Sequence, residues 1–260
     1  MDVEMLEKKG DRLSFSLKGA DPSFANALRR IAIDEVPTMS IEEVEFTKNS
    51  SVMYDEMIAH RLGLLPLKTD LKSYNLPEKC TCKGAGCAQC QLKLELSSKK
   101  AGIVYAAEIK SKDPKVVPLH PKTPVLKLIK GQDVELTATA VLGKGKEHAK
   151  WSPGIITYMQ KPVIKINNKS EKFSQHKESY PPQVFDKNGQ IKEELINTPN
   201  LIDAVDGVCD EIVKVEYKDD EFIFFVESWG QLSPKEIMQK AAEILSEKTE
   251  EFTEKIKDLG

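Results

Sequence analysis

The sequence lacks the features that mark membrane proteins, secreted proteins and stand-alone nucleic-acid binders. No apolar run among its 260 residues approaches the roughly 20 residues that a membrane helix needs. The 38 lysines and arginines and the 41 aspartates and glutamates leave a net charge of −3, whereas a chain that binds nucleic acid on its own is usually basic. The first residues are charged and acidic, unlike a secretory signal. We therefore expect a cytoplasmic protein without a membrane anchor.

Cysteine is scarce and unevenly placed. The chain has five, and four of them lie in one loop, at Cys80, Cys82, Cys87 and Cys90. An odd number clustered in this way does not fit an extracellular disulfide framework. Four thiolates this close in the sequence can instead close a tetrahedral sulfur site around a metal ion. Such a site is structural rather than catalytic, because no coordination position stays open.

The spacing alone leaves the metal undecided. Structural zinc sites have cysteines at similar separations, and an iron–sulfur cluster also accepts four cysteines. Four free thiols on a polar loop are the alternative without a metal. We predict one structural zinc ion and keep the iron–sulfur cluster as the second possibility.

Motifs of catalysis are also missing. The four histidines lie in no HExxH motif and no recognisable triad; they are His60, His120, His148 and His176. The glycine-rich segment 143–151 lacks the third glycine of a dinucleotide fingerprint and the GK[ST] of a P-loop. We interpret it as a basic loop after a strand, and a nucleotide-binding enzyme is the weakest of our functional hypotheses.

Helical periodicity predicts a helix near each end of the chain. The first begins at Asp21-Pro22, where the carboxylate can cap it and the proline fits the first turn, and it ends before Pro37. The last begins with the capping box Ser233-Pro234-Lys235-Glu236. Both carry apolar stripes, which are Phe24, Leu28 and Ile31 in the first helix and Ile237, Ala241, Leu245, Phe252 and Ile256 in the last. Physics alone leaves open whether the long last stripe meets another chain or packs within its own domain.

Between these helices the pattern is mostly that of strands, which predicts the α+β class. A strand from Met39 to Phe46 slips its phase at Glu42-Glu43, and this indicates a bulge. Two later strands, 212–217 and 221–226, are predicted to flank a turn at 218–220.

Four motifs together resemble the signature of one family. The first motif, in residues 24–37, contains Phe24-Ala-Asn26-Ala-Leu28-Arg29-Arg30 and then Glu35-Val-Pro37. The second motif, residues 58–67, reads IAHRLGLLPL; the third, residues 143–153, reads GKGKEHAKWSP; and the fourth, residues 227–230, reads ESWG. In this combination the chain resembles the α-like assembly subunits of multisubunit RNA polymerases. It is most similar to the archaeal D-type subunits, relatives of bacterial α and of the third-largest subunit of eukaryotic polymerase II.

The resemblance implies a split architecture. A dimerisation domain of hairpin strands and long helices would be interrupted by a mostly β domain, which in turn carries a small ferredoxin-like insertion. The predicted bounds are 1–48 and 222–260 for the dimerisation domain, 49–165 and 215–221 for the mostly β domain with the cysteine loop at 80–90, and 166–214 for the insertion.

The resemblance also implies the partners. The dimerisation domain would pair with a smaller α-like subunit, called L in archaea, and the pair would nucleate assembly of the two large catalytic subunits, with small subunits N and P nearby. The chain would have no catalytic residue and would meet DNA only through the complex. Residues facing the partner or the shared core would be Phe24, Leu28, Ile31, Ile237, Ala241, Leu245 and Phe252. Exposed Asn26, Arg29 and Arg30 would contact a large subunit.

One departure from the family concerns the insertion. Many archaeal relatives carry two Cys-x2-Cys-x2-Cys-x3-Cys-Pro motifs there. At the matching positions this chain has Ser170, Phe173, His176 and Tyr180, and a second copy would fall at Pro199, Ile202, Val205 and Cys209. A [4Fe–4S] cluster needs four thiolate-type ligands, so we predict a degenerate insertion that binds no cluster.

Two functions of different classes follow. The leading hypothesis is a non-catalytic scaffold subunit of DNA-dependent RNA polymerase. The alternative is an iron–sulfur redox or redox-sensing protein built on the cysteine loop, which would show visible absorbance from an iron cluster.

Overall fold

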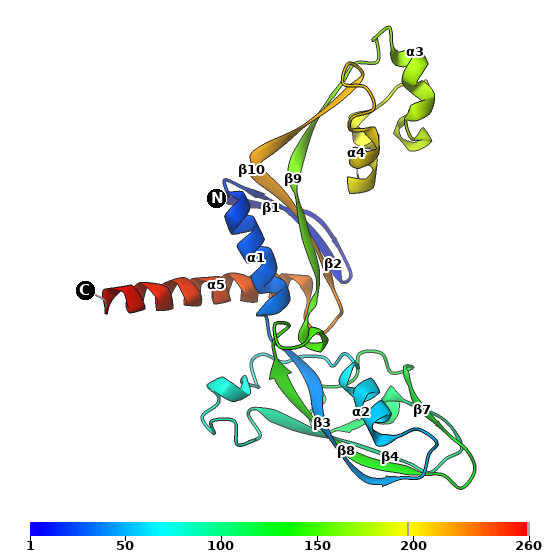
Figure 1. The fold of residues 1–260 in the computed structure, drawn as a ribbon, viewed down its shortest axis with the longest axis vertical. Coiled ribbons are helices and arrows are strands. Elements are labelled where there is room, and N and C mark those ends of the chain that lie inside the picture. Colours follow the sequence, from blue (N-terminus) through cyan, green and yellow to red (C-terminus); the bar gives the residue numbers. More distant parts are fainter. Residues whose placement is uncertain (197, 259–260) are drawn as a thin grey trace. The chain divides into compact units, whose positions relative to one another are not determined.

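The structure, a computed structural model, describes residues 1–196 and 198–258 (Figure 1). The helices are α1 (Pro22–Asp34), α2 (Asp55–Gly63), α3 (Phe173–His176), α4 (Pro199–Val205) and α5 (Pro234–Lys257). The strands are β1 (Asp2–Lys9), β2 (Arg12–Lys18), β3 (Thr38–Asn49), β4 (Gln91–Ser98), β5 (Gly102–Tyr105), β6 (Lys110–Ser111), β7 (Pro124–Leu128), β8 (Val134–Gly143), β9 (Gly154–Ile166) and β10 (Val213–Ser228). The α+β class is confirmed, and both predicted terminal helices are present.

By its internal contacts the chain divides into two compact units, which we describe separately. The first unit consists of Met1–Glu4, Phe15–Ala25 and Tyr158–Phe224. The second unit consists of Met5–Ser14, Asn26–Thr157 and the described residues from Phe225 onward.

The second unit contains an antiparallel sheet in the order β3-β8-β4-β6. The register of β3 against β8 shifts between Ile41 and Glu43, which confirms the predicted bulge. Helix α2 packs against β3 and buries Ile58 and Leu62. Aliphatic side chains of the sheet, of α2 and of the β5-β7 pair form one core, and burying each of its valine, leucine, isoleucine or methionine side chains contributes roughly 1.5–3 kcal/mol. This core supports the cysteine loop and the second motif.

Another sheet has the order β1-β2-β10-β9. Strand β10 runs unbroken through residues 218–220, so the predicted turn at this point is wrong. The backbone N–H of Gly19 donates to the carbonyl of Asp220 (2.8 Å). The next residue, Glu221, is buried, and two lysine ammonium groups contact its carboxylate. Of these contacts, the Gly19 hydrogen bond and the Lys161 ion pair come from distant residues, and they favour an extended strand where the local residues favour a turn.

Helix α5 begins with the predicted capping box. The Ser233 hydroxyl accepts a hydrogen bond from the Glu236 N–H (3.3 Å), and the Glu236 carboxylate accepts one from the Ser233 N–H (2.9 Å). The first turns bury Ile237 and Ala241. Every residue from 246 to 258 is exposed; in Figure 1 this is the red half of the helix.

The polar segment after β9 has a small core of its own in the first unit. Its buried members are Tyr180, Val184, Ile191, Ile196, Ile202, Val205, Ile212 and Val213. Helix α4 carries Ile202 and Val205, and a short 3-10 turn carries Val184. This segment therefore folds around apolar side chains.

Candidate metal centre and subunit interface

The four loop cysteines converge on one point. Their sulfur atoms all lie within 4.8 Å of one another. The Sγ atoms of Cys80 and Cys87 are 3.5 Å apart, those of Cys82 and Cys90 are 3.5 Å apart, and those of Cys87 and Cys90 are 3.9 Å apart. Four sulfurs bound at 2.3 Å to a tetrahedral ion would lie about 3.8 Å from one another. The separations fit a four-coordinate metal ion and are far longer than the roughly 2 Å of a disulfide.

The loop backbone is shaped for this convergence. Lys83, Gly84 and Gly86 have φ values of +53°, +83° and +87°, in the left-handed region that glycine tolerates best. The N–H of Cys90 donates to the carbonyl of Cys87 (3.0 Å). Strand β4 begins directly after the last cysteine, so the sheet anchors one end of the site.

The ionisation of the thiols also suits a cation. Burial, aided by thiol hydrogen bonds from Cys82 and Cys80, raises the pKa of Cys90 to about 12. Burial raises the pKa of Cys82 as well, but hydrogen bonds from Cys80 and Cys90 outweigh it and lower that pKa to about 6. Crowded thiols therefore cannot all ionise together unless a positive ion neutralises them. The four cysteines can hold a metal ion.

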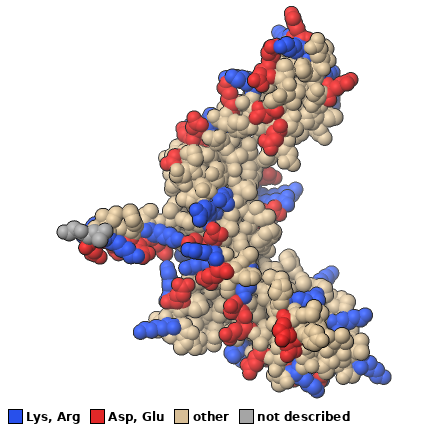
Figure 2. Space-filling model, in the orientation of Figure 1, with Lys and Arg blue, Asp and Glu red and all other residues tan. Residues whose placement is uncertain are grey.

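The predicted interface residues of the two terminal helices fall into two groups. Buried in the interior of the chain are Leu28, Ile31, Ile237 and Ala241. Phe24 and Leu245 are half-buried. Phe252 and Ile256 are 65% and 50% exposed, which makes an apolar stripe at the tip of α5. Figure 2 shows lysine and glutamate side chains intermixed around that tip. The interface prediction itself stays a prediction.

The arginines of the first motif differ from the expectation in one respect. Arg30 is exposed, but Asn26 and Arg29 are half-buried. The guanidinium of Arg29 donates two hydrogen bonds to the Asn26 side-chain oxygen (2.9 and 3.2 Å). Because this pair satisfies groups within one helix, the expectation that all three side chains are exposed is wrong, and Arg30 is the one free to reach a partner.

Sequence reasoning missed an ion pair between the end of α1 and α5. The ammonium of Lys248 lies 2.6 Å from the carboxylate of Glu35, whose side chain is 16% exposed. Burial raises the pKa of Glu35, but the Lys248 hydrogen bond and the charges of Lys144 and Lys146 outweigh it, so the pKa is lowered. Glu35 belongs to the first motif, and its place there was the sequence signal that could have marked it as a functional residue.

The third motif packs a loop against the end of α1. A Cβ atom added to Gly145 would lie 2.4 Å from the carbonyl oxygen of Ile33. The N–H of Lys146 donates to the carbonyl of Asp34 (2.9 Å). A helix C-terminus carries partial negative charge, so this geometry opposes a phosphate group. The nucleotide-loop hypothesis therefore has no structural support.

We expect Gly145→Ala to destabilise the chain by roughly 2 kcal/mol or more, because backbone must move to admit the methyl group. Gly63→Ala is the matched control, since its Cβ would meet its nearest atom, the Ile41 carbonyl oxygen, at an ordinary 3.5 Å. Urea unfolding of the two variants measures the difference. Equal midpoints for both would contradict the packing role.

The degenerate positions of the insertion lie in or near its apolar core. Tyr180 is buried in this core, and Phe173 of α3 packs against the core. Ser170 and His176 are half-buried. Ile202 and Val205 of the second copy are core members, and Cys209 packs beside them. Several of these positions thus belong to the apolar core or pack beside it. That the insertion binds no cluster stays a prediction.

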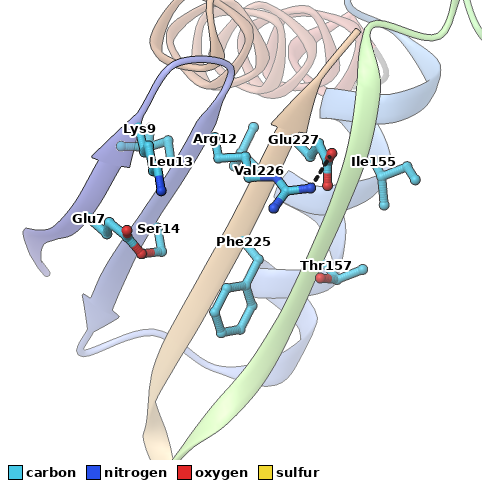
Figure 3. A pocket seen from close by; sticks show the side chains of 10 residues that line it. All are labelled: Glu7, Lys9, Arg12, Leu13, Ser14, Ile155, Thr157, Phe225, Val226 and Glu227. Atoms are coloured by element: carbon cyan, nitrogen blue, oxygen red, sulfur yellow. Dashed lines mark hydrogen bonds and ion pairs between the residues drawn. The ribbon is translucent and has the colours of Figure 1, made fainter. Parts of the chain in front are cut away.

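A hollow lies on the sheet of β1, β2, β9 and β10 (Figure 3). Its most prominent polar pair is Arg12 and Glu227, 2.9 Å apart and both exposed. The remaining lining side chains include Ser14, Thr157 and Phe225 but neither histidine nor cysteine. An exposed ion pair of this kind contributes little energy, and nothing in the lining links the hydroxyl groups to a histidine base. In the described part of the chain, no helix is long and apolar enough to span a membrane.

These features define a class: an α+β protein with a four-cysteine loop and a long terminal helix whose apolar tip is exposed. Comparison of the sequence with known protein families identifies the family. The chain matches the RNA polymerase Rpb3/Rpb11 dimerisation domain family over residues 14–249, and it belongs to that family.

Relatives cover the whole chain. The DNA-directed RNA polymerase subunit Rpo3 of Archaeoglobus fulgidus is 37% identical over 99% of this chain and 98% of its own length. The Rpo3 subunit of Pyrococcus furiosus is 36% identical over 100% of this chain and 98% of its own length. The DNA-directed RNA polymerase II subunit rpb3 of Dictyostelium discoideum is 36% identical over 95% of this chain and 92% of its own length. Archaeal and eukaryotic subunits are thus similar to it throughout.

Proposed function

We propose that this chain is a non-catalytic assembly subunit of an archaeal DNA-directed RNA polymerase. The observation that carries the proposal is the family match across nearly the full chain, to subunits of that enzyme in archaea. The exposed apolar tip of α5 gives such a subunit a surface to bury against another chain. Nothing in the comparisons favours the iron–sulfur redox protein.

The chain contributes structure and the catalytic chemistry belongs to other subunits. Nucleotidyl transfer needs Mg²⁺ held by carboxylates. Among the described residues, the cysteine loop is the one group of three or more potential ligands gathered together. Those thiolates suit a structural ion, which we propose to be zinc because four sulfurs close a tetrahedron without an open position.

The interface would follow from the two helices. Phe24, Leu245 and Phe252 would meet the smaller α-like subunit L, while Leu28, Ile31, Ile237 and Ala241 support that surface from the core. Arg30 would contact a large catalytic subunit, with small subunits N and P nearby. We keep the proposed division into a dimerisation domain (1–48 and 222–260), a mostly β domain (49–165 and 215–221) and an insertion (166–214). The chain would contact DNA only as part of the assembled enzyme, and the enzyme would be located in the cytoplasm.

Affinity purification tests this function. The chain, tagged at one end and expressed in its own organism, should retain the other polymerase subunits and support templated RNA synthesis by the purified complex. Recovery of the chain alone, or with an electron-transfer partner, would reject the proposal.

We expect Arg30→Ala to lower recovery of the large subunits about tenfold, because a guanidinium makes charge-assisted hydrogen bonds of roughly 1.5–3 kcal/mol. Since Arg30 is exposed, the fold and the pair with the small α-like subunit should survive. Arg12→Ala is the control, because Arg12 is an exposed arginine whose ion pair with Glu227 is worth little. Quantitative mass spectrometry of the purified complexes distinguishes the two variants. Unchanged recovery with Arg30→Ala would remove Arg30 from the interface.

A further inference from the structure

The paired strands β5 and β7 of the second unit present an exposed face that the proposed function does not use. The two strands are antiparallel, and Ile103 lies directly opposite Lys127 in their register. Their inward side chains belong to the core of the neighbouring sheet, and these are Val104, Leu126 and Leu128. Successive side chains of a strand point to opposite faces, so Ile103 and Lys127 share the outward face.

Three large apolar side chains gather on this outward face. Ile103 is 46% exposed, Tyr105 is 39% exposed and Ile129 is 57% exposed. Ile103 and Tyr105 are alternate residues of β5, and Ile129 follows two residues after Lys127, which places it diagonal to Ile103. Single exposed apolar residues are common, but neighbouring ones mark a surface for interaction. We call these three residues the apolar patch.

Lysines surround the apolar patch. Residues 99–130 include eight lysines but only one glutamate and one aspartate, which leaves a charge of +6 in a chain whose net charge is −3. One lysine lies within the strand pair and four stand just beyond its ends, and the five are Lys127, Lys99, Lys100, Lys122 and Lys130. None of the ion pairs between described residues uses any of these five side chains.

The two carboxylates of this segment bond elsewhere. Glu108 accepts a hydrogen bond from the Tyr105 N–H (3.0 Å). Asp113 accepts one from the Tyr74 hydroxyl (2.9 Å) and one from the Lys115 N–H (2.9 Å). Because neither carboxylate contacts the five lysines, the positive charge around the apolar patch is available to an anion from outside the chain.

The core holds the apolar patch in a fixed position. The Arg61 guanidinium of α2 donates to the carbonyl of Pro124, the first residue of β7 (2.9 Å). In the turn after β7, the Ile129 N–H donates to the Gln132 side-chain oxygen (3.0 Å), and the Ile129 carbonyl accepts from the Gln132 N–H (3.1 Å). A partner therefore meets a surface that needs little ordering.

From this arrangement we propose that the outward face of β5 and β7 docks an acidic segment of another protein. Carboxylates of the segment would meet the surrounding lysines, and its apolar side chains would cover Ile103, Tyr105 and Ile129. The lysines supply charge complementarity and faster encounter, and the apolar patch supplies area to bury. This docking goes beyond subunit assembly through α1 and α5.

A nucleic acid fits the same surface less well. Its phosphates would match the lysines, but its bases stack on aromatic side chains or on arginine, and two of the three patch residues are isoleucines. Residues 99–130 contain no arginine, the residue that pairs with phosphate through two hydrogen bonds. The apolar patch therefore favours a protein segment.

Binding of an acidic peptide to the full-length chain tests the proposal. The probe is a fluorescein-labelled peptide in which glutamates alternate with leucines and phenylalanines, and fluorescence anisotropy measures its dissociation constant. Lys127→Glu should raise this constant about fivefold, because an attractive charge becomes a repulsive one. Ile103→Thr keeps a β-branched side chain but removes apolar area, and it should raise the constant about threefold.

Matched substitutions elsewhere control for charge and polarity. Lys187→Glu makes the same charge change at another exposed position, and Ile155→Thr removes a 50% exposed isoleucine from a strand of another sheet. Both should bind the peptide as the unaltered chain does, and circular dichroism should show all four variants folded. Equal constants for Lys127→Glu and Lys187→Glu would overturn the proposal. An unchanged constant for Ile103→Thr would also overturn it, because it would reduce the surface to one that attracts any polyanion.

Photo-crosslinking in the chain's own organism identifies the occupant. Ile129→p-benzoylphenylalanine should crosslink to an acidic segment of another protein, mapped by mass spectrometry, and adding Lys127→Glu should lower this yield about fivefold. Ile155→p-benzoylphenylalanine, at a similarly exposed position, is the control with no such product. Crosslinks to nucleic acid, to a second copy of this chain or to a segment without acidic residues would overturn the proposal, as would a yield no higher than that of the control. Peptide binding uses the full-length chain alone, so it holds or fails whether or not the chain enters a polymerase.

Discussion

Cys90→Ser is expected to abolish metal binding at the proposed four-cysteine site and to open the loop that forms it. Cys90 is 2% exposed, and its sulfur lies within reach of two other ligands, 3.5 Å from that of Cys82 and 3.9 Å from that of Cys87. A four-sulfur zinc site has an apparent binding free energy of about 10–16 kcal/mol in small peptides. Replacing one thiolate by a weakly coordinating hydroxyl should cost several kcal/mol of it, on the order of a thousandfold or more in affinity.

Metal content measured by inductively coupled plasma mass spectrometry tests this expectation. The unaltered chain should carry about one zinc ion and Cys90→Ser almost none after a mild chelator. Cys209→Ser is the matched control, because Cys209 packs against the core of the insertion and not in the loop. Limited proteolysis should cut segment 79–90 faster in Cys90→Ser alone. Equal zinc in both variants would rule out the four-cysteine site. Iron together with sulfide in the unaltered chain would mean that the four cysteines hold an iron–sulfur cluster and not zinc.

Phe252→Asp is expected to weaken pairing with the proposed smaller α-like partner strongly and to leave this chain folded. Phe252 is 65% exposed, so its replacement should change the free energy of unfolding by no more than about 0.5 kcal/mol. A buried aromatic anchor at an interface contributes 2 kcal/mol or more, and a desolvated carboxylate adds a further penalty. The dissociation constant should therefore rise by at least about 30-fold.

Isothermal titration of this chain with its small partner measures the loss. Gln239→Asp introduces the same charge at an exposed position on the other face of α5, and it should pair normally. Circular dichroism of the free chains confirms that both variants are folded. Normal pairing of Phe252→Asp would exclude the tip of α5 from the interface and would direct attention to Phe24 and Leu245.

Local signals predicted the elements that depend on neighbouring residues. The capping box at Ser233 and Glu236 predicted the start of α5, because it needs four consecutive residues and no tertiary contact. The phase slip at Glu42-Glu43 predicted the bulge in β3 for the same reason. The predicted turn at 218–220 was wrong, because the hydrogen bond from Gly19 to Asp220 and the ion pair of Lys161 with Glu221 join distant residues and outweigh the local turn preference in β10.

The sequence by itself determined the family, the α+β class and the four cysteine positions of the candidate metal centre, because each can be recognised from residue types and short spacings. The tertiary structure decided which apolar residues are free. Ile237 and Ala241 lie in the same stripe as Phe252, yet the first two are buried and the last is exposed. Burial depends on what packs against a helix face, and periodicity cannot supply that. For the same reason only the fold placed Ile103 opposite Lys127 on one exposed face, because the two residues belong to different strands.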